Sequence, residues 1–130
     1  MPERSPFRTW NGIQAYEIFD GVRLHAVGGD QVLLCRVQYE PGKQVHRHAH
    51  EHSEQLMAVI EGTVTMTIGD ETRELGPGDV ACVNRGVEHE LFSEGGVTFF
   101  ETLSPVPLDH VPDRDRDLVL AEGGVTHVAR

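Results

Sequence analysis

Apolar and polar residues alternate over short stretches of this chain. From Thr63 to Ile68, the apolar side chains of Val64 and Met66 stand opposite threonines. The stretch 32–39 alternates in the same way. A period of two predicts β-strands with one dry face and one wet face. Alternation and short apolar runs together predict about eight strands, at residues 12–19, 22–27, 32–39, 55–60, 63–68, 80–83, 89–93 and 97–103.

Turn-forming dipeptides separate these runs. Fourteen glycines and seven prolines punctuate the chain, and convincing helical periodicity is absent. The turn signals are Asp20-Gly21, Gly28-Gly29, Glu61-Gly62, Gly69-Asp70, Pro77-Gly78 and Gly95-Gly96. Short strands joined by tight turns and a few longer links predict an all-β fold, with two sheets arranged as a jelly-roll barrel.

The length of 130 residues indicates one domain. A chain of this size can bury a core without metal or disulfide staples, so a metal site would serve function rather than folding. The strands and motifs define a central region of about residues 30–103. Residues 104–130 are rich in proline and mixed charge, and we expect this C-terminal tail to lie over the barrel or a partner subunit.

Charge and composition exclude several classes of partner. Eleven basic against 21 acidic residues give a net charge of −10, which repels a phosphate backbone, so nucleic acid is not expected. A signal-peptide pattern and a long apolar run are both absent, which predicts a cytoplasmic protein with no membrane partner. Cys35 and Cys82 lie in apolar runs and are predicted to be buried free thiols, with one disulfide as the alternative.

Four histidines at alternate positions are the most informative feature: His46, His48, His50 and His52. Strand residues two apart share a face at about 6.5–7 Å, so one adjacent pair can converge on a metal ion. The ends of the run are about 20 Å apart and cannot both reach it. Further ligands must come from other strands, and His89 is the candidate. An exposed polar strand that binds metal only adventitiously is the alternative.

The spacing around these histidines resembles the two sequence motifs of the cupin superfamily. The first motif is matched by Gly42, His48-Ala49-His50, Gln55 and Gly62, with Gln where Glu is usual. The second is matched by Gly78, Asn84-Arg85-Gly86, His89 and Ser93, with Asn for the usual Pro and Ser for the usual Asn. The resemblance implies a double-stranded β-helix and, by analogy with other cupins, a homodimer.

Carried over by position, the resemblance implies that His48, His50, Gln55 and His89 bind one divalent transition metal. Zinc, nickel, iron, manganese and copper all accept imidazole ligands. Glu54 or His52 could replace Gln55 as the third ligand, and His46 is expected near the rim of the site. Gly62 and Gly86 are then turn glycines.

Three imidazoles and one amide are neutral ligands, so the ion would keep its full charge and act as a Lewis acid. This chemistry suits an isomerase, cyclase or lyase acting on an enolisable, oxygen-rich small molecule, similar to the cupin polyketide cyclases and the uronate-linearising cupins. A metal-dependent dioxygenase and a non-catalytic ligand-binding cupin are the alternatives. The Ser104-Pro105 pair is similar to the C-terminal sequence of the uronate enzymes, but their aromatic residue and their arginine are missing, which argues against a uronate. An apolar cavity lining would suit a more hydrophobic ligand.

Glu101 is the candidate catalytic residue for proton transfer. It shares strand parity with Phe99 and Leu103, and a carboxylate on an inward face needs a partner or a task. The opposite orientation of this strand would place Glu101 in water. The apolar residues Met57, Val59, Leu91, Phe99 and Leu103 either line a substrate cavity or form the core.

Overall fold

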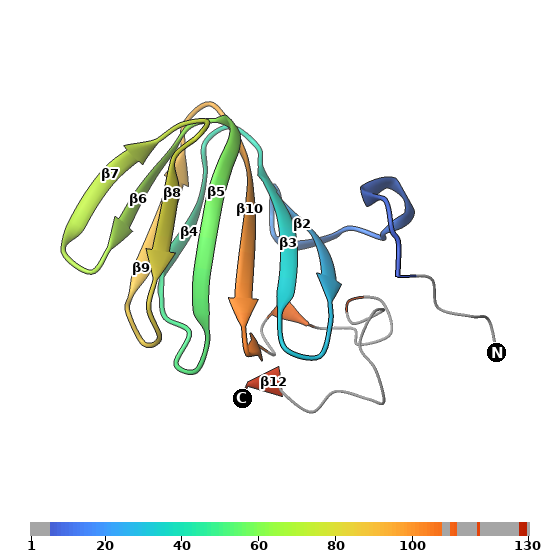
Figure 1. Cartoon of the computed structure of the whole chain (residues 1–130). Coiled ribbons are helices and arrows are strands. Elements are labelled where there is room, and N and C mark those ends of the chain that lie inside the picture. The colour runs from blue at the N-terminus through green and yellow to red at the C-terminus, as the bar shows by residue number, and fades with distance from the viewer. Residues whose placement is uncertain (1–5, 108–109, 112–116, 118–127, 130) are drawn as a thin grey trace.

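Residues 6–107, 110, 111, 117, 128 and 129 are described in the computed structural model, and strands make up most of their regular secondary structure. Figure 1 shows the strands, with β7 and β2 at opposite sides of the molecule. The elements are η1 (Trp10–Gly12), β1 (Tyr16–Phe19), β2 (Val22–Gly28), β3 (Leu33–Tyr39), β4 (Lys43–His48), β5 (Glu54–Gly62), β6 (Val64–Ile68), β7 (Glu71–Leu75), β8 (Val80–Val83), β9 (His89–Ser93), β10 (Val97–Ser104), β11 (Val106–Pro107) and β12 (Val128–Ala129).

Two antiparallel sheets form the body of the fold. The larger has the order β1-β2-β3-β10-β5-β8, and the smaller has the order β4-β9-β6-β7. Strands far apart in sequence are neighbours in both sheets, because β10 pairs with β3 and β5 while β9 pairs with β4 and β6. This order confirms the predicted all-β jelly-roll architecture. A separate parallel pair joins β11 to β12.

The strongly alternating stretches form the predicted strands. In β6, Val64 and Met66 are buried between exposed or half-exposed threonines, as the period of two requires. The first strand is shorter than predicted, because a 3-10 turn occupies Trp10–Gly12 and β1 begins only at Tyr16. The side chain of Thr9 caps this turn by accepting a hydrogen bond from the Gly12 N–H.

Strands β4 and β7 are not among the eight predicted strands. Four of the five β7 residues are exposed and the fifth is half-buried, so β7 has no apolar alternation by which a sequence pattern could find it. Its backbone pairing with β6 defines it instead. Among the described residues, no helix is long and apolar enough to cross a membrane.

Both cysteines are free, which excludes the disulfide alternative. Cys35 is buried as predicted, but the prediction that Cys82 is buried is wrong, because it is exposed. Alternation along β8 turns Val83 into the core and therefore turns Cys82 outward. An apolar neighbourhood in sequence does not tell which face of a strand is covered.

The core lies between the two sheets and extends to the beginning of the C-terminal tail. Val106 and Val111 are buried with the strand residues, so this part of the tail packs on the barrel as expected. The charged stretch 112–116 lies outside the described residues. Met57, Val59 and Leu103 belong to the packed core.

Candidate metal centre

The four-histidine run brings only part of its length to the interior, and a bulge in β4 decides which part. Val45 pairs with Leu91, whereas His48 pairs with His89, so β4 has one more residue than β9 between these pairs. Without the extra residue, alternation would turn Arg47 inward with Val45. The bulge shifts this parity by one and places His48 opposite His89.

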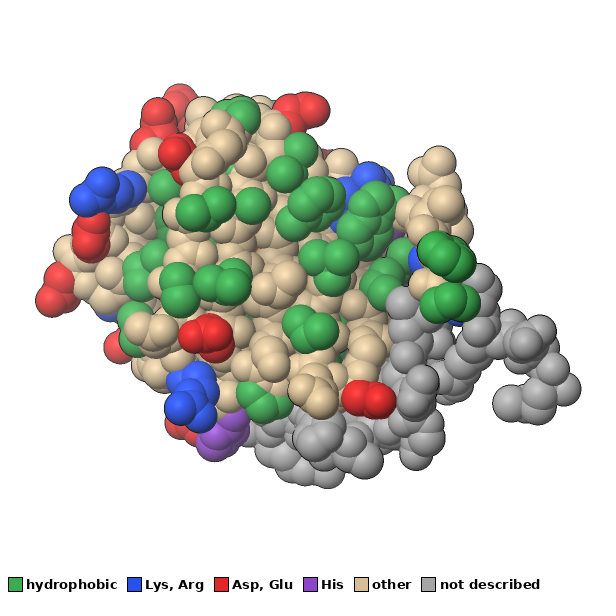
Figure 2. Space-filling model, viewed as in Figure 1, with side chains coloured by type: hydrophobic (Ala, Val, Ile, Leu, Met, Phe, Trp, Pro, Cys, Tyr) green, Lys and Arg blue, Asp and Glu red, His purple; other side chains and the backbone are tan. Residues whose placement is uncertain are grey.

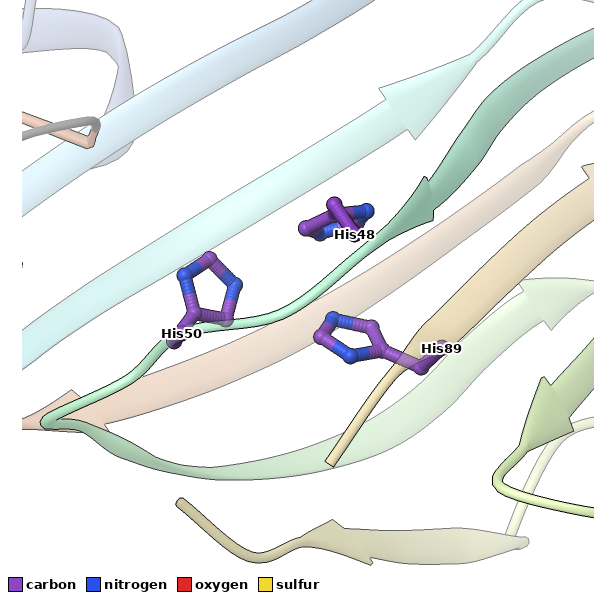
Figure 3. Close-up of side chains that lie close together, drawn as sticks. All are labelled: His48, His50 and His89. Atoms are coloured by element: carbon purple, nitrogen blue, oxygen red, sulfur yellow. The ribbon is translucent and has the colours of Figure 1, made fainter. Parts of the chain in front are cut away.

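His50 joins the pair from the loop that follows β4. Its carbonyl accepts a 2.8 Å hydrogen bond from the N–H of Gly86, in the turn before β9. The turn that precedes His89 therefore also fixes the backbone of His50. Figure 3 shows the three imidazoles facing a common space, from the end of β4, the loop and the start of β9.

The geometry of the three rings fits a single ion. One nitrogen from each of His48, His50 and His89 lies within 4.8 Å of the others. The His89 ring centroid is 4.1 Å from that of His48 and 5.2 Å from that of His50. Ligand nitrogens at about 2.0–2.1 Å from one metal ion are separated from each other by less than this limit, so small rotations of the rings suffice for coordination.

Backbone hydrogen bonds fix the tautomers of two of these histidines. Nδ1 of His48 lies 2.8 Å from the carbonyl oxygen of His46, and Nδ1 of His89 lies 3.1 Å from that of Val87. A carbonyl can only accept, so each Nδ1 carries the proton and each neutral ring keeps its Nε2 lone pair. Outer hydrogen bonds of this kind orient imidazole ligands in metal sites.

His89 is fully buried, and its environment keeps the ring neutral. Burial lowers the pKa of His89 from 6.5 to about 4; the Val87 carbonyl opposes this fall, nearby His48 and His50 add to it, and Glu101 opposes it. Its Nε2 has no hydrogen-bond partner among the described residues. A neutral, desolvated nitrogen with an available lone pair is suited to a metal ion.

Gln55 lines the same cavity as the histidines, whereas the alternative third ligands, Glu54 and His52, do not. The Gln55 side chain is 2% exposed, lines the same cavity, and has an Oε1 with no partner among the described residues. Glu54 is exposed because it has the opposite parity on β5. The His52 side chain is 58% exposed and lies near Glu51. His46 lines the cavity from an exposed position and contacts Gln44, as expected for the rim.

The histidines stand in a cavity of about 650 Å³ between the sheets. Glu101, on β10, faces this cavity and is 5% exposed, so the strand has the orientation that turns Glu101 inward. Burial, and then the Glu101 carboxylate, raise the pKa of Tyr39 on the adjoining wall. Leu91 and Phe99 line the cavity, but Met57, Val59 and Leu103 do not. Other apolar lining residues are Ile18, Phe19, Val37 and Val45.

His110 is a cavity residue that was not among the site residues predicted from the sequence. This residue follows β11, lines the cavity, and has its Nε2 3.3 Å from Oε1 of Glu101. Its ring centroid is 5.1 Å from that of His50. No motif marks His110, because it stands 60 residues after His50 in the proline-rich tail. Only the path of the folded chain brings it to the centre.

The chain belongs to the cupin domain family, which its sequence matches over residues 35–101. This region includes all four residues that the motif resemblance implies as ligands. The fold described above, with its two sheets and a histidine cluster between them, agrees with that assignment.

Individual relatives agree with the family assignment. The chain is 28% identical over 72 residues to the tetracenomycin polyketide synthase protein TcmJ of Streptomyces glaucescens, a match that covers 55% of this chain and 48% of TcmJ. The match therefore spans about half the length of that curated relative. Among solved structures, an RmlC-like cupin from Shewanella frigidimarina superposes with a TM-score of 0.74 at 20% identity, covering 78% of this chain and 92% of the other. A cupin from Silicibacter pomeroyi described as a sugar phosphate isomerase gives 0.70 at 21% identity, covering 78% and 77%.

Proposed function

We propose that this protein is a metal-dependent enzyme that isomerises, cyclises or eliminates an enolisable, oxygen-rich small molecule without redox chemistry. The observation that carries the proposal is the convergence of three imidazoles beside a buried carboxylate in one cavity. TcmJ, whose name places it with a polyketide synthase, supports a substrate related to polyketides.

The donor set fits a divalent transition metal. His48, His50 and His89 would supply nitrogens, and the partnerless Oε1 of Gln55 would supply an oxygen. All four donors are neutral, so a divalent ion would polarise a substrate carbonyl with its full charge. The protein contributes ligands oriented by backbone carbonyls, in a cavity between the two sheets.

In this proposal Glu101 carries out the proton transfer. Its carboxylate faces the cavity and is buried, where it interacts electrostatically with His89. In the proposed reaction this carboxylate takes a proton from the carbon next to the polarised carbonyl, and the C–H electron pair moves toward the carbonyl oxygen. Return of the proton to another atom completes an isomerisation, and no oxidant or reductant is consumed.

The cavity also limits the substrate. Its volume is within the range of small-molecule sites. The histidines, Gln55 and Glu101 are among its polar lining residues. The apolar lining residues Leu91 and Phe99 lie on the same strands as His89 and Glu101, β9 and β10. This mixed lining suits a molecule with carbonyl or hydroxyl oxygens and a hydrocarbon or aromatic body.

Metal binding is the first test of the proposal. We expect the wild-type protein to retain about one transition-metal ion per chain in elemental analysis, and His48→Ala and His89→Ala to lose most of it, since each removes a converging nitrogen. His52→Ala is the matched control, because His52 lies outside the cluster, and it should keep the metal. Equal metal content in all four proteins would contradict the site.

A second test compares substitutions at two neighbouring residues, the buried Gln55 and the exposed Glu54. Gln55→Glu adds a negative charge beside the ion, so we expect tighter Co²⁺ binding in a titration and slower turnover, because the ion becomes a weaker Lewis acid. Glu54→Gln should change neither the Co²⁺ affinity nor the turnover rate.

Two other outcomes would support the alternative functions. Oxygen consumption during turnover would support a dioxygenase, and a ligand recovered unchanged would support a binding protein.

A further inference from the structure

His110 shares the cavity wall with the proposed metal centre but lies outside the family-matched region. The match ends at residue 101, and the C-terminal segment carries His110 back to the cavity. The residue is 9% exposed. A buried imidazole must be hydrogen-bonded or have a task, since desolvation of its polar ring is unfavourable.

Three contacts hold this segment in place. The Tyr16 hydroxyl, on β1, donates a 2.9 Å hydrogen bond to the His110 carbonyl. Ser53, in the loop after His50, donates to the Pro105 carbonyl. Val111, the residue after His110, is buried in the core. These contacts are made at Pro105, at His110 itself and at Val111, and they hold His110 at the cavity wall.

The ring lies next to both the Glu101 carboxylate and the histidine cluster. The Nε2 atom of His110 lies 3.3 Å from Glu101 Oε1. The ring centroid of His110 is 5.1 Å from that of His50, and the His48 centroid is also 5.1 Å from that of His50. His110 is not in the converging group of three. A ligand oxygen on the next alternate carbon, four bonds from an oxygen held at the centre, would come within reach of the His110 ring.

We propose that His110 contacts the substrate. The His110 ring, oriented by Glu101, forms a hydrogen bond with a substrate oxygen that lies beyond the two oxygens held at the metal. This inference rests on the proposed function and narrows it. The substrate class becomes a compound with oxygens on at least three alternate carbons, two for the metal centre and one for His110. Glu101 acts on His110 as a positioning residue, in addition to its proposed proton transfer.

The test uses two probes on the full-length Co²⁺-loaded protein, followed by the visible absorption of the ion. Acetylacetone offers two oxygens on alternate carbons, and heptane-2,4,6-trione offers three. We expect His110→Phe to weaken binding of the trione about tenfold, the value of one good hydrogen bond, while acetylacetone and Co²⁺ bind as to wild type. His110→Gln keeps a hydrogen-bonding side chain and should retain most of the trione affinity.

Tyr16→Phe provides a second variant in case phenylalanine disturbs folding at position 110. It removes only the hydroxyl that holds the His110 carbonyl, and we expect it to weaken the trione more than acetylacetone. Equal loss of both probes, or no loss of the trione, in His110→Phe and Tyr16→Phe would overturn the role of His110. Failure of wild type to bind Co²⁺, or of the Co²⁺-loaded wild type to bind acetylacetone, would overturn the proposed function itself.

Discussion

His89 has a polar ring that is completely buried, and this burial lowers the free energy of unfolding at acidic pH. The native protein holds the ring neutral with a pKa of about 4, whereas the unfolded chain protonates it near 6.5. Between these values the unfolded state binds more protons than the native state, so the free energy of unfolding falls as the pH is lowered through this range. Above about 6.5 both states are neutral at this residue and the effect vanishes.

The pKa difference predicts a measurable pH dependence of stability. At about 1.4 kcal/mol per pKa unit, protonation of His89 in the unfolded chain lowers the free energy of unfolding by about 2 to 3 kcal/mol between pH 7 and pH 4.5. Urea unfolding of metal-free protein at both pH values measures it. His89→Gln is the reference, because it shares the other titrating groups, and its loss over the same interval should be smaller by that amount. Identical losses would show that His89 does not titrate as described.

At the scale of elements, one bulge and one turn position the site, and a second turn joins β5 to β6. The β4 bulge turns His48 inward, and the turn before β9 holds His50 through Gly86. Gly62 ends β5 and leads into β6. The backbone φ angle is +78° at Gly62 and +77° at Gly86. Other residues adopt this conformation only with strain.

The two glycines differ in their surroundings, and this difference gives a matched prediction. A Cβ at Gly62 would overlap the backbone carbonyl of Gly96, whereas a Cβ at Gly86 meets nothing within 4 Å. We therefore expect Gly86→Ala to lower the free energy of unfolding by about 1 kcal/mol from conformational strain alone. Gly62→Ala should cost at least about twice that in urea unfolding, because backbone atoms must also move. Similar losses for both variants would contradict the close approach of Gly62 to Gly96.

At the scale of the whole molecule, the outer face of the six-stranded sheet carries several exposed apolar side chains. Residues paired across β10, β5 and β8 present Phe100, Ala58 and Val80 in one row and Thr102, Leu56 and Cys82 in the next. Val80 is 74% exposed and Leu56 is 50% exposed. Figure 2 shows apolar side chains gathered on the face of the molecule where Figure 1 draws β5 and β8. Apolar patches of this kind mark interaction sites.

The homodimer expected from the cupin resemblance stays a prediction, and we expect this face to form it. Light scattering should give a mass twice that of the 14.4 kDa chain. Leu56→Glu and Val80→Glu should shift the mass toward the monomer, since each would bury an unpaired charge at the contact. Phe92→Glu is the control, because Phe92 is similarly exposed on the four-stranded sheet, and it should remain dimeric. A monomeric wild type would exclude the dimer.

The sequence by itself determined the strands with clear alternation, the turns between them and the family. The motif spacing marked His48, His50 and His89, which the structure brings together, and Gln55, which it places beside them. The strands and turns were accessible because strand parity and turn glycines are local properties of neighbouring residues, whereas the ligand residues followed from the resemblance to the cupin motifs.

Only the tertiary structure decided what depends on contacts between distant segments. It turned Glu101 inward, left Cys82 exposed, and showed that β7 exists through its pairing with β6. It also brought His110 from the tail to the cavity, 60 residues after His50. A local pattern specifies which residues share a face, but which face is covered, and by which segment, is settled only when the sheets and the tail pack together.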